Sequence, residues 1–223
     1  MVPSRTPNPE PRTPGKLRLA VLLSGSGTTL QNFIDLIAAG RLPAEIVLVV
    51  SSRKDAYGLE RARKAGIPAV VLRPKDFAAQ QEFTAAVFAE VEKARAGLVC
   101  FAGFMVKLGI PKRWANRVMN VHPALLPAFG GQGMYGHFVH EAVLAAGCKV
   151  TGATVHLVDN EYDRGPIVLQ KAVEVRAEDT ADTLAARVQA AERELYPQAV
   201  SLYAAGRLSV RGGRVQVLPE AKA

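Results

Sequence analysis

Short, continuous apolar runs alternate with segments of helical periodicity in the first half of this chain. The apolar runs are Leu17–Leu23, Glu45–Val50, Pro68–Leu72 and Leu98–Ala102. The helical segments between them are Thr28–Ala39, Gly58–Ala65 and Gln81–Ala94. A continuous apolar strand is typical of a parallel sheet covered on both faces, and strand–helix–strand units form right-handed crossovers. The pattern therefore predicts an α/β fold with a mostly parallel, twisted sheet flanked by helices.

The second half of the chain follows a different pattern. Here we expect strands at Val118–Val121, Thr151–Val158 and Ile167–Val175, and helices at His140–Ala146 and Thr180–Leu195. The last two strands flank a polar loop, which is typical of an antiparallel hairpin. Gly212-Gly213 lies between short β-prone runs and predicts a small terminal hairpin. The sequence thus indicates a Rossmann-like fold with a C-terminal antiparallel hairpin extension.

The length predicts one large domain, residues 17–206, between two flanking segments; two closely fused lobes are the alternative. Residues 1–16 hold five prolines and lack the apolar stretch of a signal peptide, so we expect a disordered extension. Residues 207–223 form the expected C-terminal tail with its small hairpin. No run approaches the ~20 apolar residues that span a bilayer, so we expect no membrane partner.

The charge is basic but dispersed. Lys and Arg number 28 against 20 Asp and Glu, giving a net charge of +8, yet no basic block or aromatic-basic motif is present. We therefore expect small-molecule substrates, with a preference for anions, and no nucleic acid. Cys100 and Cys148 form no CxxC, which favours two buried, reduced thiols in a cytoplasmic protein. The oligomeric state, monomer or homodimer, is left open.

A glycine-rich loop, Ser24–Thr29, connects the first expected strand to the first helix. Free N–H groups and hydroxyls at a helix N-terminus bind anions. The dinucleotide fingerprint fails because Leu30 replaces its third glycine, and no lysine follows the glycines as a Walker A motif requires. The loop favours a phosphate ester that is not a dinucleotide; the alternative is a helix cap without a ligand.

Asn120 and His122 end a strand and lie two residues apart, so they share one face of it. The loop around Asp163 could bring a carboxylate to that face. An amide donor, an imidazole and a carboxylate suit acyl transfer to an amine, since the first stabilises an oxyanion and the second moves protons. No activated Ser or Cys is apparent, which favours direct attack by the substrate amine. A purely structural Asn–His pair is the alternative.

Three further histidines carry weaker signals. His137 and His140 are spaced i, i+3 without an HExxH motif, so we expect no metal site. His156 alternates with apolar neighbours and is interpreted as a hydrogen-bonded core histidine that lines the site wall.

Four motifs in this order resemble the formyltetrahydrofolate-dependent formyltransferases. They are LLSGSGTTLQ, AGFM, NVHPALLPAFGG and VTGATVHLVDNEYDRGPIVLQ, and the resemblance covers about residues 17–207. The opening SGSGTTLQ favours the branch that acts on phosphoribosylglycinamide. The resemblance implies transfer of a formyl group from the co-substrate 10-formyltetrahydrofolate to the amine of N1-(5-phosphoribosyl)glycinamide in de novo purine biosynthesis, without a metal.

The resemblance also implies roles for individual residues. His122 would be the acid/base, Asn120 would hold the formyl oxygen, and Asp163 would raise the pKa of His122. The substrate phosphate and ribose would be bound by Gly27, Thr28, Thr29, Gln189 and Glu192. The glycinamide and folate would be bound by Gly103, Met105, Val106, Lys107, Leu108, Asn120 and Gln80. Thr29, Val106 and Gln80 stand where the family commonly has Asn, a basic residue and Arg.

Other functions remain open beside this one. A formyltetrahydrofolate hydrolase commonly has an N-terminal regulatory domain, for which 16 residues are too few, and a methionyl-tRNA formyltransferase needs a further C-terminal domain. A sugar-nucleotide formyltransferase also binds a phosphorylated amine. A non-catalytic, Rossmann-like nucleotide-binding regulator would use the Ser24–Thr29 loop without chemistry and would bind NAD(P) tightly.

Overall fold

The computed structural model describes residues 15–220, so all but the last two residues of the expected N-terminal extension lie outside it. The strands are β1 (Leu17–Leu23), β2 (Ala44–Ser51), β3 (Ala69–Val71), β4 (Leu98–Phe101), β5 (Val118–His122), β6 (Val150–Leu157), β7 (Ile167–Glu174), β8 (Leu208–Arg211) and β9 (Arg214–Val217). The helices are α1 (Thr28–Ala38), α2 (Tyr57–Lys64), α3 (Gln80–Lys93), α4 (His137–Ala145) and α5 (Ala181–Ala204), with short 3-10 turns at Pro74–Asp76 and Lys112–Trp114.

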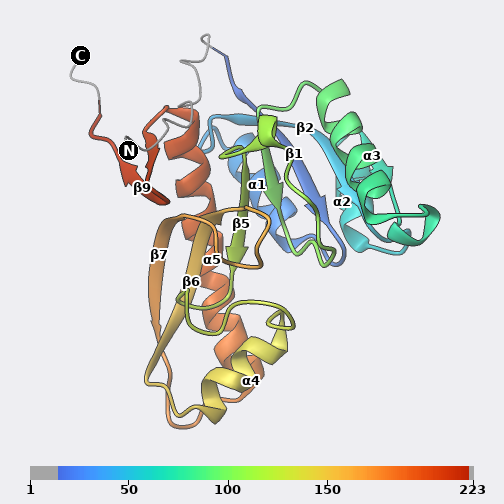
Figure 1. Cartoon of the computed structure of the whole chain (residues 1–223). Helices are drawn as coiled ribbons and strands as arrows, with labels where there is room; N and C mark the ends of the chain where they lie inside the picture. Colours follow the sequence, from blue (N-terminus) through green and yellow to red (C-terminus); the bar gives the residue numbers. More distant parts are fainter. Residues whose placement is uncertain (1–14, 221–223) are drawn as a thin grey trace. The chain divides into compact units, whose positions relative to one another are not determined.

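The strands confirm the predicted fold class. Seven of them are hydrogen-bonded in the order β3-β2-β1-β4-β5-β6-β7 (Figure 1). β1 pairs in parallel with β2 and β4, and β2 pairs in parallel with β3. β6 and β7 are antiparallel, as expected, and β8 and β9 form a separate antiparallel pair. The tight β8–β9 turn uses Gly212 and Gly213, both with positive φ, which glycine adopts without strain.

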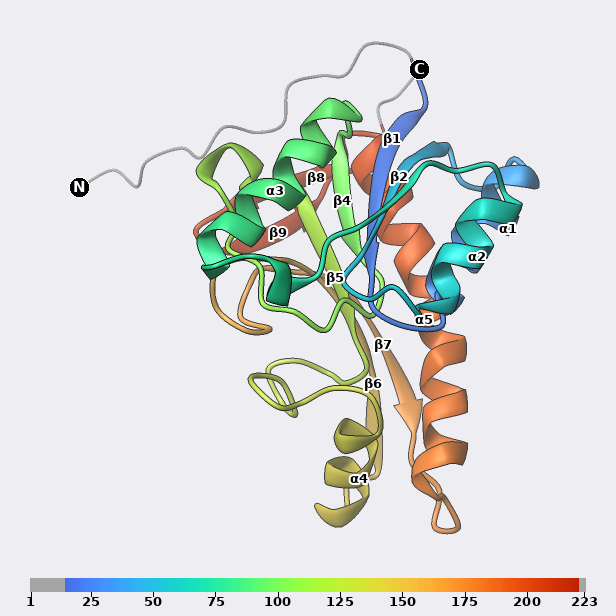
Figure 2. The same ribbon diagram turned by 90° about the vertical axis from the view of Figure 1, so that its right-hand side faces the viewer.

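The chain divides into two compact units, whose described parts are residues 15–119 and 120–220. In the first unit α1 and α2 cover one face of the parallel strands and α3 covers the other (Figure 2). β1 is central, and its residues from Leu19 to Leu23 are fully buried. This double coverage explains why its sequence is a continuous apolar run rather than an alternating one.

In the second unit α5 packs against β6, β7 and α4. The helix continues to Ala204, nine residues past the expected end at Leu195, and it includes Pro197. A proline inside a helix costs about 3 kcal/mol. Burial of Tyr196, Val200 and Tyr203 beside it offsets that cost, because each large apolar side chain contributes roughly 1.5–3 kcal/mol.

Two smaller expectations were wrong. α4 begins at His137 rather than His140, because Gly136 at φ 53° turns the chain into the helix three residues earlier. Cys100 is buried in β4, but Cys148 is only half-buried since it lies in the loop after α4, and loops run over protein surfaces. Neither cysteine forms a disulfide within residues 15–220.

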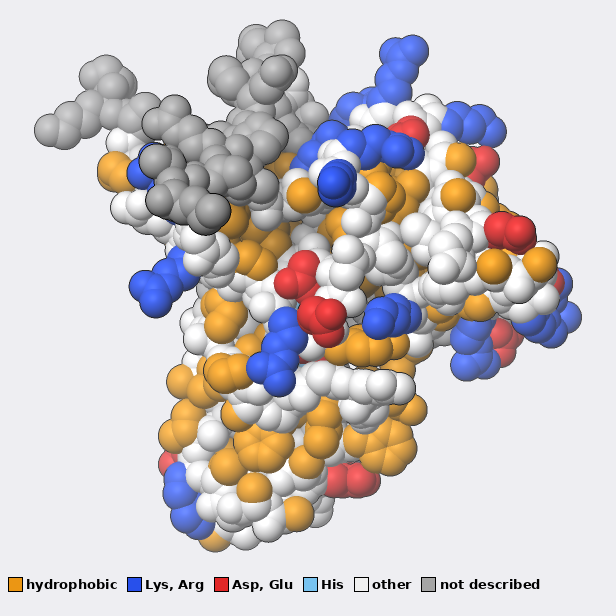
Figure 3. Space-filling model, viewed as in Figure 1, with side chains coloured by type: hydrophobic (Ala, Val, Ile, Leu, Met, Phe, Trp, Pro, Cys, Tyr) orange, Lys and Arg blue, Asp and Glu red, His pale blue; other side chains and the backbone are white. Residues whose placement is uncertain are grey.

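The helices and the surface bear on membrane association and on the distribution of charge. Within residues 15–220, no helix combines the length and apolar character needed to cross a membrane. On the face shown in Figure 3, Lys and Arg side chains lie in separate groups among acidic and apolar ones.

Candidate active site

The Ser24–Thr29 loop, called the glycine loop below, begins where β1 ends. Gly27 is the N-cap of α1 with φ 70°, and no side chain caps the helix there. Gly27 lies so close to α2 that an added Cβ would be 2.6 Å from the Cα of Gly58. A residue other than glycine would therefore be strained and would collide with α2. The first turn of α1, with Thr28 and Thr29, therefore has no side-chain cap for its N–H groups, and such groups are favourable partners for an anion.

Ser24 joins the glycine loop to the segment after β4, residues 102–108. Its N–H donates to the Gly103 carbonyl at 3.0 Å, and its Oγ accepts from the Met105 N–H at 2.9 Å. The same Oγ lies 2.7 Å from the Oγ of Ser52, at the end of β2. Ser24 is buried, so these bonds fix the glycine loop and the 102–108 segment side by side.

The 102–108 segment contains the residues expected to meet the glycinamide and the folate. Gly103 has φ 71°, Met105 and Lys107 are exposed, Val106 is half-buried and Leu108 is buried. The Gln80 side chain, from the first turn of α3, donates to the Lys107 carbonyl. Gln80 therefore holds the segment in place, and the Lys107 carbonyl already has a partner.

His122 lies buried at the end of β5, with an acceptor opposite each ring nitrogen. Nε2 is 2.8 Å from the Phe129 carbonyl, and Nδ1 is 3.6 Å from Oδ2 of Asp163. A carbonyl can only accept, so Nε2 carries a proton and donates it to Phe129. The neutral ring then presents its Nδ1 lone pair to Asp163, and only the protonated ring satisfies both acceptors.

Asp163 also contacts a second histidine. Its Oδ1 is 3.5 Å from Nε2 of His156, while its Oδ2 accepts from the Gly131 N–H at 3.0 Å. The same Nε2 lies 3.2 Å from Nδ2 of Asn120. The structure therefore brings Asn120, His122 and Asp163 into one cluster with His156, which is buried and hydrogen-bonded as expected.

Burial sets the charge of this cluster. Desolvation lowers the pKa of His122, and it outweighs the Asp163 carboxylate and the Phe129 carbonyl, which both raise it. Burial acts to raise the pKa of Asp163, but His156, His122 and the Gly131 N–H together bring that pKa below its ordinary value. The Asp163 carboxylate thus raises the His122 pKa, as the resemblance implies. The net shift of that pKa is nevertheless downward.

Two polar residues that sequence reasoning missed anchor the loop after His122. Thr154 Oγ1, on β6, donates to the Ala124 carbonyl at 2.6 Å and accepts from the Leu126 N–H at 3.0 Å. Gln170, on β7, donates to the Leu126 carbonyl at 2.9 Å. Both lie inside the VTGATVHLVDNEYDRGPIVLQ motif, which was the only available signal for them.

The remaining predicted substrate contacts lie on α5. Gln189 is exposed and Glu192 is half-buried, one helical turn apart. Desolvation raises the pKa of Glu192 to about 7, although Arg193 lowers it. Glu192 is therefore not on a solvated helix face, which spacing alone would have favoured.

His137 and His140 lie in different surroundings. His137 is exposed and lies 3.5 Å from Oδ1 of Asp182, whereas His140 is buried. Burial lowers the pKa of His140, and the charges of His137 and His122 lower it further. Within residues 15–220, no group of three or more His, Cys, Asp or Glu side chains is arranged to hold a metal ion.

Comparison with known proteins places this geometry in a family. The formyl transferase model matches residues 17–200. The chain is 38% identical over 197 residues to phosphoribosylglycinamide formyltransferase of Haemophilus influenzae, covering 87% of this chain and 90% of that protein. It is 42% identical to glycinamide ribonucleotide transformylase 1 from Symbiobacterium toebii, whose crystal structure superposes with a TM-score of 0.87 over 93% of this chain and 96% of that one.

A chicken relative shows the same domain inside a longer protein. The trifunctional purine biosynthetic protein adenosine-3 of Gallus gallus is 43% identical over 197 residues, which is 87% of this chain but 19% of the relative. The chain spans between 14% and 20% of the length of the trifunctional relatives that it matches. It belongs to the formyl transferase family, and within it to the phosphoribosylglycinamide formyltransferases.

Proposed function

We propose that the chain transfers a formyl group from 10-formyltetrahydrofolate to the amine of N1-(5-phosphoribosyl)glycinamide, in de novo purine biosynthesis. The observation that carries the proposal is the cluster of Asn120 and Asp163 with the buried His122 and His156, in a chain that spans nearly the whole Haemophilus enzyme. Together these groups supply a donor for an oxyanion and a titratable ring beside a carboxylate, which formyl transfer to an amine requires.

His122 is the proposed acid/base. The substrate amine attacks the formyl carbon, a C–N bond forms, and the bond from that carbon to N10 of the folate breaks. One proton leaves the attacking nitrogen and one reaches N10, so the overall reaction releases none. Because Nδ1 of His122 faces Asp163, the reacting groups must meet Nε2, and the Phe129 carbonyl must leave that nitrogen.

Asn120 is the proposed oxyanion donor. Its amide group has two N–H bonds, and the His156 ring uses one of them. The second is available to the oxygen of the tetrahedral intermediate. A single preorganised donor of this kind contributes about 2.7–4 kcal/mol to an acyl-transfer transition state.

Binding of the two substrates is assigned to three further segments. The glycine loop, with Gly27, Thr28 and Thr29, would hold the phosphate, and Gln189 and Glu192 would hold the ribose and phosphate. Gly103 and Met105 would meet the glycinamide, and the backbone from Met105 to Leu108 would meet the pterin. The proposal for the pterin rests on the fixed geometry that Ser24 and Gln80 give this segment.

The proposal extends to the surroundings of the protein. Two cysteines outside any disulfide, one of them only half-buried, suit the reducing cytoplasm. Both substrates are small anionic molecules, which agrees with the dispersed basic charge of the chain. A nucleic-acid partner is not part of the proposal, and the state of the protein, monomer or homodimer, stays a prediction.

A spectrophotometric assay tests the function directly. Purified, folded protein with both substrates should release tetrahydrofolate, and His122→Ala should lower kcat by about a hundredfold or more, the usual contribution of an acid/base group. His137→Ala, which removes an exposed histidine, is the matched control and should leave kcat within twofold.

Each alternative predicts a different outcome of the same assay. Tetrahydrofolate release without any amine would identify a hydrolase, and turnover only with an amino-sugar nucleotide would identify a sugar-nucleotide formyltransferase. Tight NAD(P) binding without folate binding would identify a regulator. Absence of turnover with phosphoribosylglycinamide in folded protein would refute the proposal.

A further inference from the structure

The carbonyl groups of the glycine loop are bound by α2. The Gly58 N–H donates to the Gly25 carbonyl at 3.1 Å, and Nε of Arg61 donates to the Ser26 carbonyl at 2.9 Å. Gly58 is required for this approach, since a Cβ there would lie 2.5 Å from Cδ2 of Leu23. The first turns of α2 therefore lie against the glycine loop and bind two successive carbonyl groups.

These two bonds fix the direction of two N–H groups. The Gly25 carbonyl shares a peptide plane with the Ser26 N–H, and the Ser26 carbonyl shares one with the Gly27 N–H. Both peptides are trans, and in a trans peptide the C=O and N–H bonds point in opposite directions. With the carbonyls held toward α2, the N–H groups of Ser26 and Gly27 point away from α2, toward the outer side of the loop.

The Arg61 guanidinium is itself held in place. Its NH1 group donates to Oε1 of Gln31 at 3.0 Å, Gln31 in turn donates to Oδ1 of Asp35 at 2.8 Å, and the guanidinium carbon lies 5.0 Å from the centre of the Tyr57 ring. One part-buried side chain thereby connects the glycine loop, α1 and α2.

The guanidinium of Arg61 differs from those of other arginines in this part of the chain in having no carboxylate partner within the described residues. Arg53, Arg63 and Arg73 each form an ion pair with a nearby carboxylate: Asp55, Glu60 and Asp76. Among residues 15–220, no carboxylate lies within 4 Å of the Arg61 guanidinium, whose hydrogen bonds go to a carbonyl and an amide. Its positive charge is therefore not neutralised by a direct partner, and it lies directly behind the glycine loop.

We propose that Arg61 is a positioning residue for phosphate recognition. Through the Ser26 carbonyl it aims the Gly27 N–H at the phosphate of the substrate, and its unpaired charge adds an attraction for the dianion. The inference rests on the proposed function, since that function places the phosphate at Gly27, Thr28 and Thr29. It explains how a loop without Lys or Arg of its own could bind a doubly charged group.

Equilibrium binding separates this role from a merely structural one. Calorimetry would measure the affinity of wild type, Arg61→Met and Arg61→Lys for phosphoribosylglycinamide and for the same molecule without its phosphate. Arg61→Met should weaken binding of the phosphorylated form about tenfold and leave the dephosphorylated form unchanged. Arg61→Lys keeps the charge but not the planar fork of donors, so its affinity for the phosphorylated form should fall by less than that of Arg61→Met.

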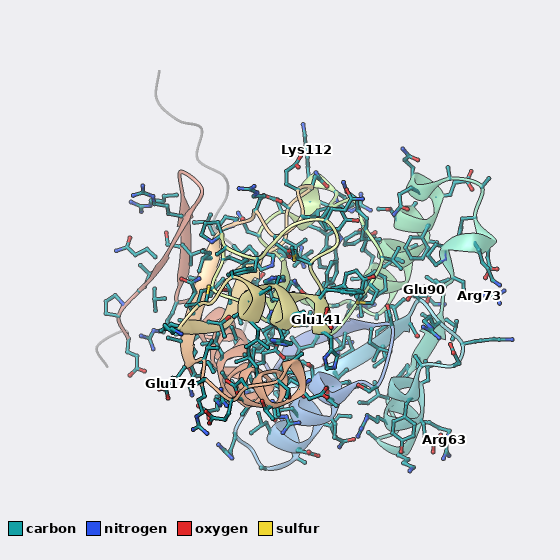
Figure 4. The ribbon with its side chains drawn as sticks, turned by 90° about the horizontal axis from the view of Figure 1, so that it is seen from below. Arg63, Arg73, Glu90, Lys112, Glu141 and Glu174 are labelled. Carbon is teal, nitrogen blue, oxygen red and sulfur yellow. The ribbon has the colours of Figure 1, made fainter. Side chains whose placement is uncertain are left out.

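Arg63→Met is the matched control. It lies two residues away on the same helix, its side chain is 71% exposed and paired with Glu60, and Figure 4 shows it at the periphery of the molecule. It should bind both compounds as wild type does. Circular dichroism would establish that each variant is folded. If Arg61→Met does not fold, the ratio of the two affinities of Arg61→Lys, for the phosphorylated and the dephosphorylated compound, decides.

The two proposals fail in distinguishable ways. If wild type prefers the phosphorylated compound but neither Arg61 variant changes that preference, the role of Arg61 is refuted and the function stands. Equal weakening toward both compounds would also refute it, since it would indicate a general structural effect. If wild type shows no preference for the phosphate, the phosphate site itself is refuted, and with it both proposals.

Discussion

At the scale of single residues, the proposed chemistry depends on one buried ring between two acceptors. Nε2 of His122 donates to a carbonyl, and Nδ1 faces a carboxylate at 3.6 Å. Burial favours the neutral ring, so its pKa is below the ordinary value and the free protein holds it uncharged at neutral pH. In the proposed mechanism, Asp163 is the group that stabilises the imidazolium formed transiently on His122.

Asp163→Asn should lower kcat about a hundredfold and change KM little, because the lost interaction is strongest in the transition state. Removal of the carboxylate removes a contribution that raises the His122 pKa, so that pKa should fall further below its ordinary value. Steady-state kinetics and an NMR titration of the histidines would measure both effects.

Asp159→Asn is the control for this substitution. Asp159 is an exposed carboxylate of the same loop, and its Oδ1 accepts the Glu161 N–H. The control should keep both kcat and the His122 pKa. A wild-type rate in Asp163→Asn would remove Asp163 from the mechanism.

How far the site could be predicted depends on how far apart in the sequence the contacting residues lie. The two-residue spacing of Asn120 and His122 is local, and the two side chains indeed share the Asp163–His156 cluster. The anchoring of the His122 loop by Thr154 and Gln170 depends on the register of β6 and β7 against that loop, which no local pattern records. The contact of His122 with Phe129 is made by a backbone carbonyl, so no residue type in the sequence indicates it.

At the scale of elements, α5 carries a carboxyl group in an apolar setting. Glu192 lies one turn from Gln189 on a helix that buries Val188, Ala191 and Leu195. Desolvation raises its pKa from 4.5 to about 7. A group whose folded-state pKa is raised stabilises the fold below its unfolded pKa, and this contribution is lost as pH rises through the folded pKa.

Glu192→Gln should therefore change how stability depends on pH. At pH 4 the variant and wild type should unfold at similar urea concentrations, whereas at pH 8 the variant should be more stable by roughly 2–3 kcal/mol. Urea titrations at the two pH values measure the difference.

Glu194→Gln provides the comparison for this variant. Its side chain is 60% exposed and paired with Lys171, so its effect should stay within about 1 kcal/mol at both pH values. If Glu192→Gln follows wild type across the whole pH range, Glu192 is solvated in the folded protein and the account of α5 is wrong.

Elements were predicted best where the pattern is local. β1 and the β6–β7 hairpin follow from runs of apolar residues and turn signals, and they form as expected. The end of α5 did not follow, because Pro197 is a strong local signal for a helix end. Burial of Tyr196, Ala199, Val200 and Tyr203 overrides it, and burial is decided by contacts distant in sequence.

At the scale of the whole molecule, the proposed machinery is divided between two compact units. Residues 15–119 hold the glycine loop, Arg61 and the 102–108 segment, and residues 120–220 hold the His122 cluster and α5. The sequence pattern predicts one continuous domain from 17 to 206, since strands and helices follow each other without a linker. The division falls inside β5, close to Val118, where the sequence pattern changes.

A crystal structure with phosphoribosylglycinamide and a folate analogue tests the central claim most directly. The account predicts the phosphate at the N–H groups of Gly27, Thr28 and Thr29, with the reacting amine and N10 of the folate next to Nε2 of His122 and the Phe129 carbonyl displaced from that nitrogen. A phosphate bound elsewhere, or a His122 ring still bonded to Phe129 and remote from both ligands, would contradict it.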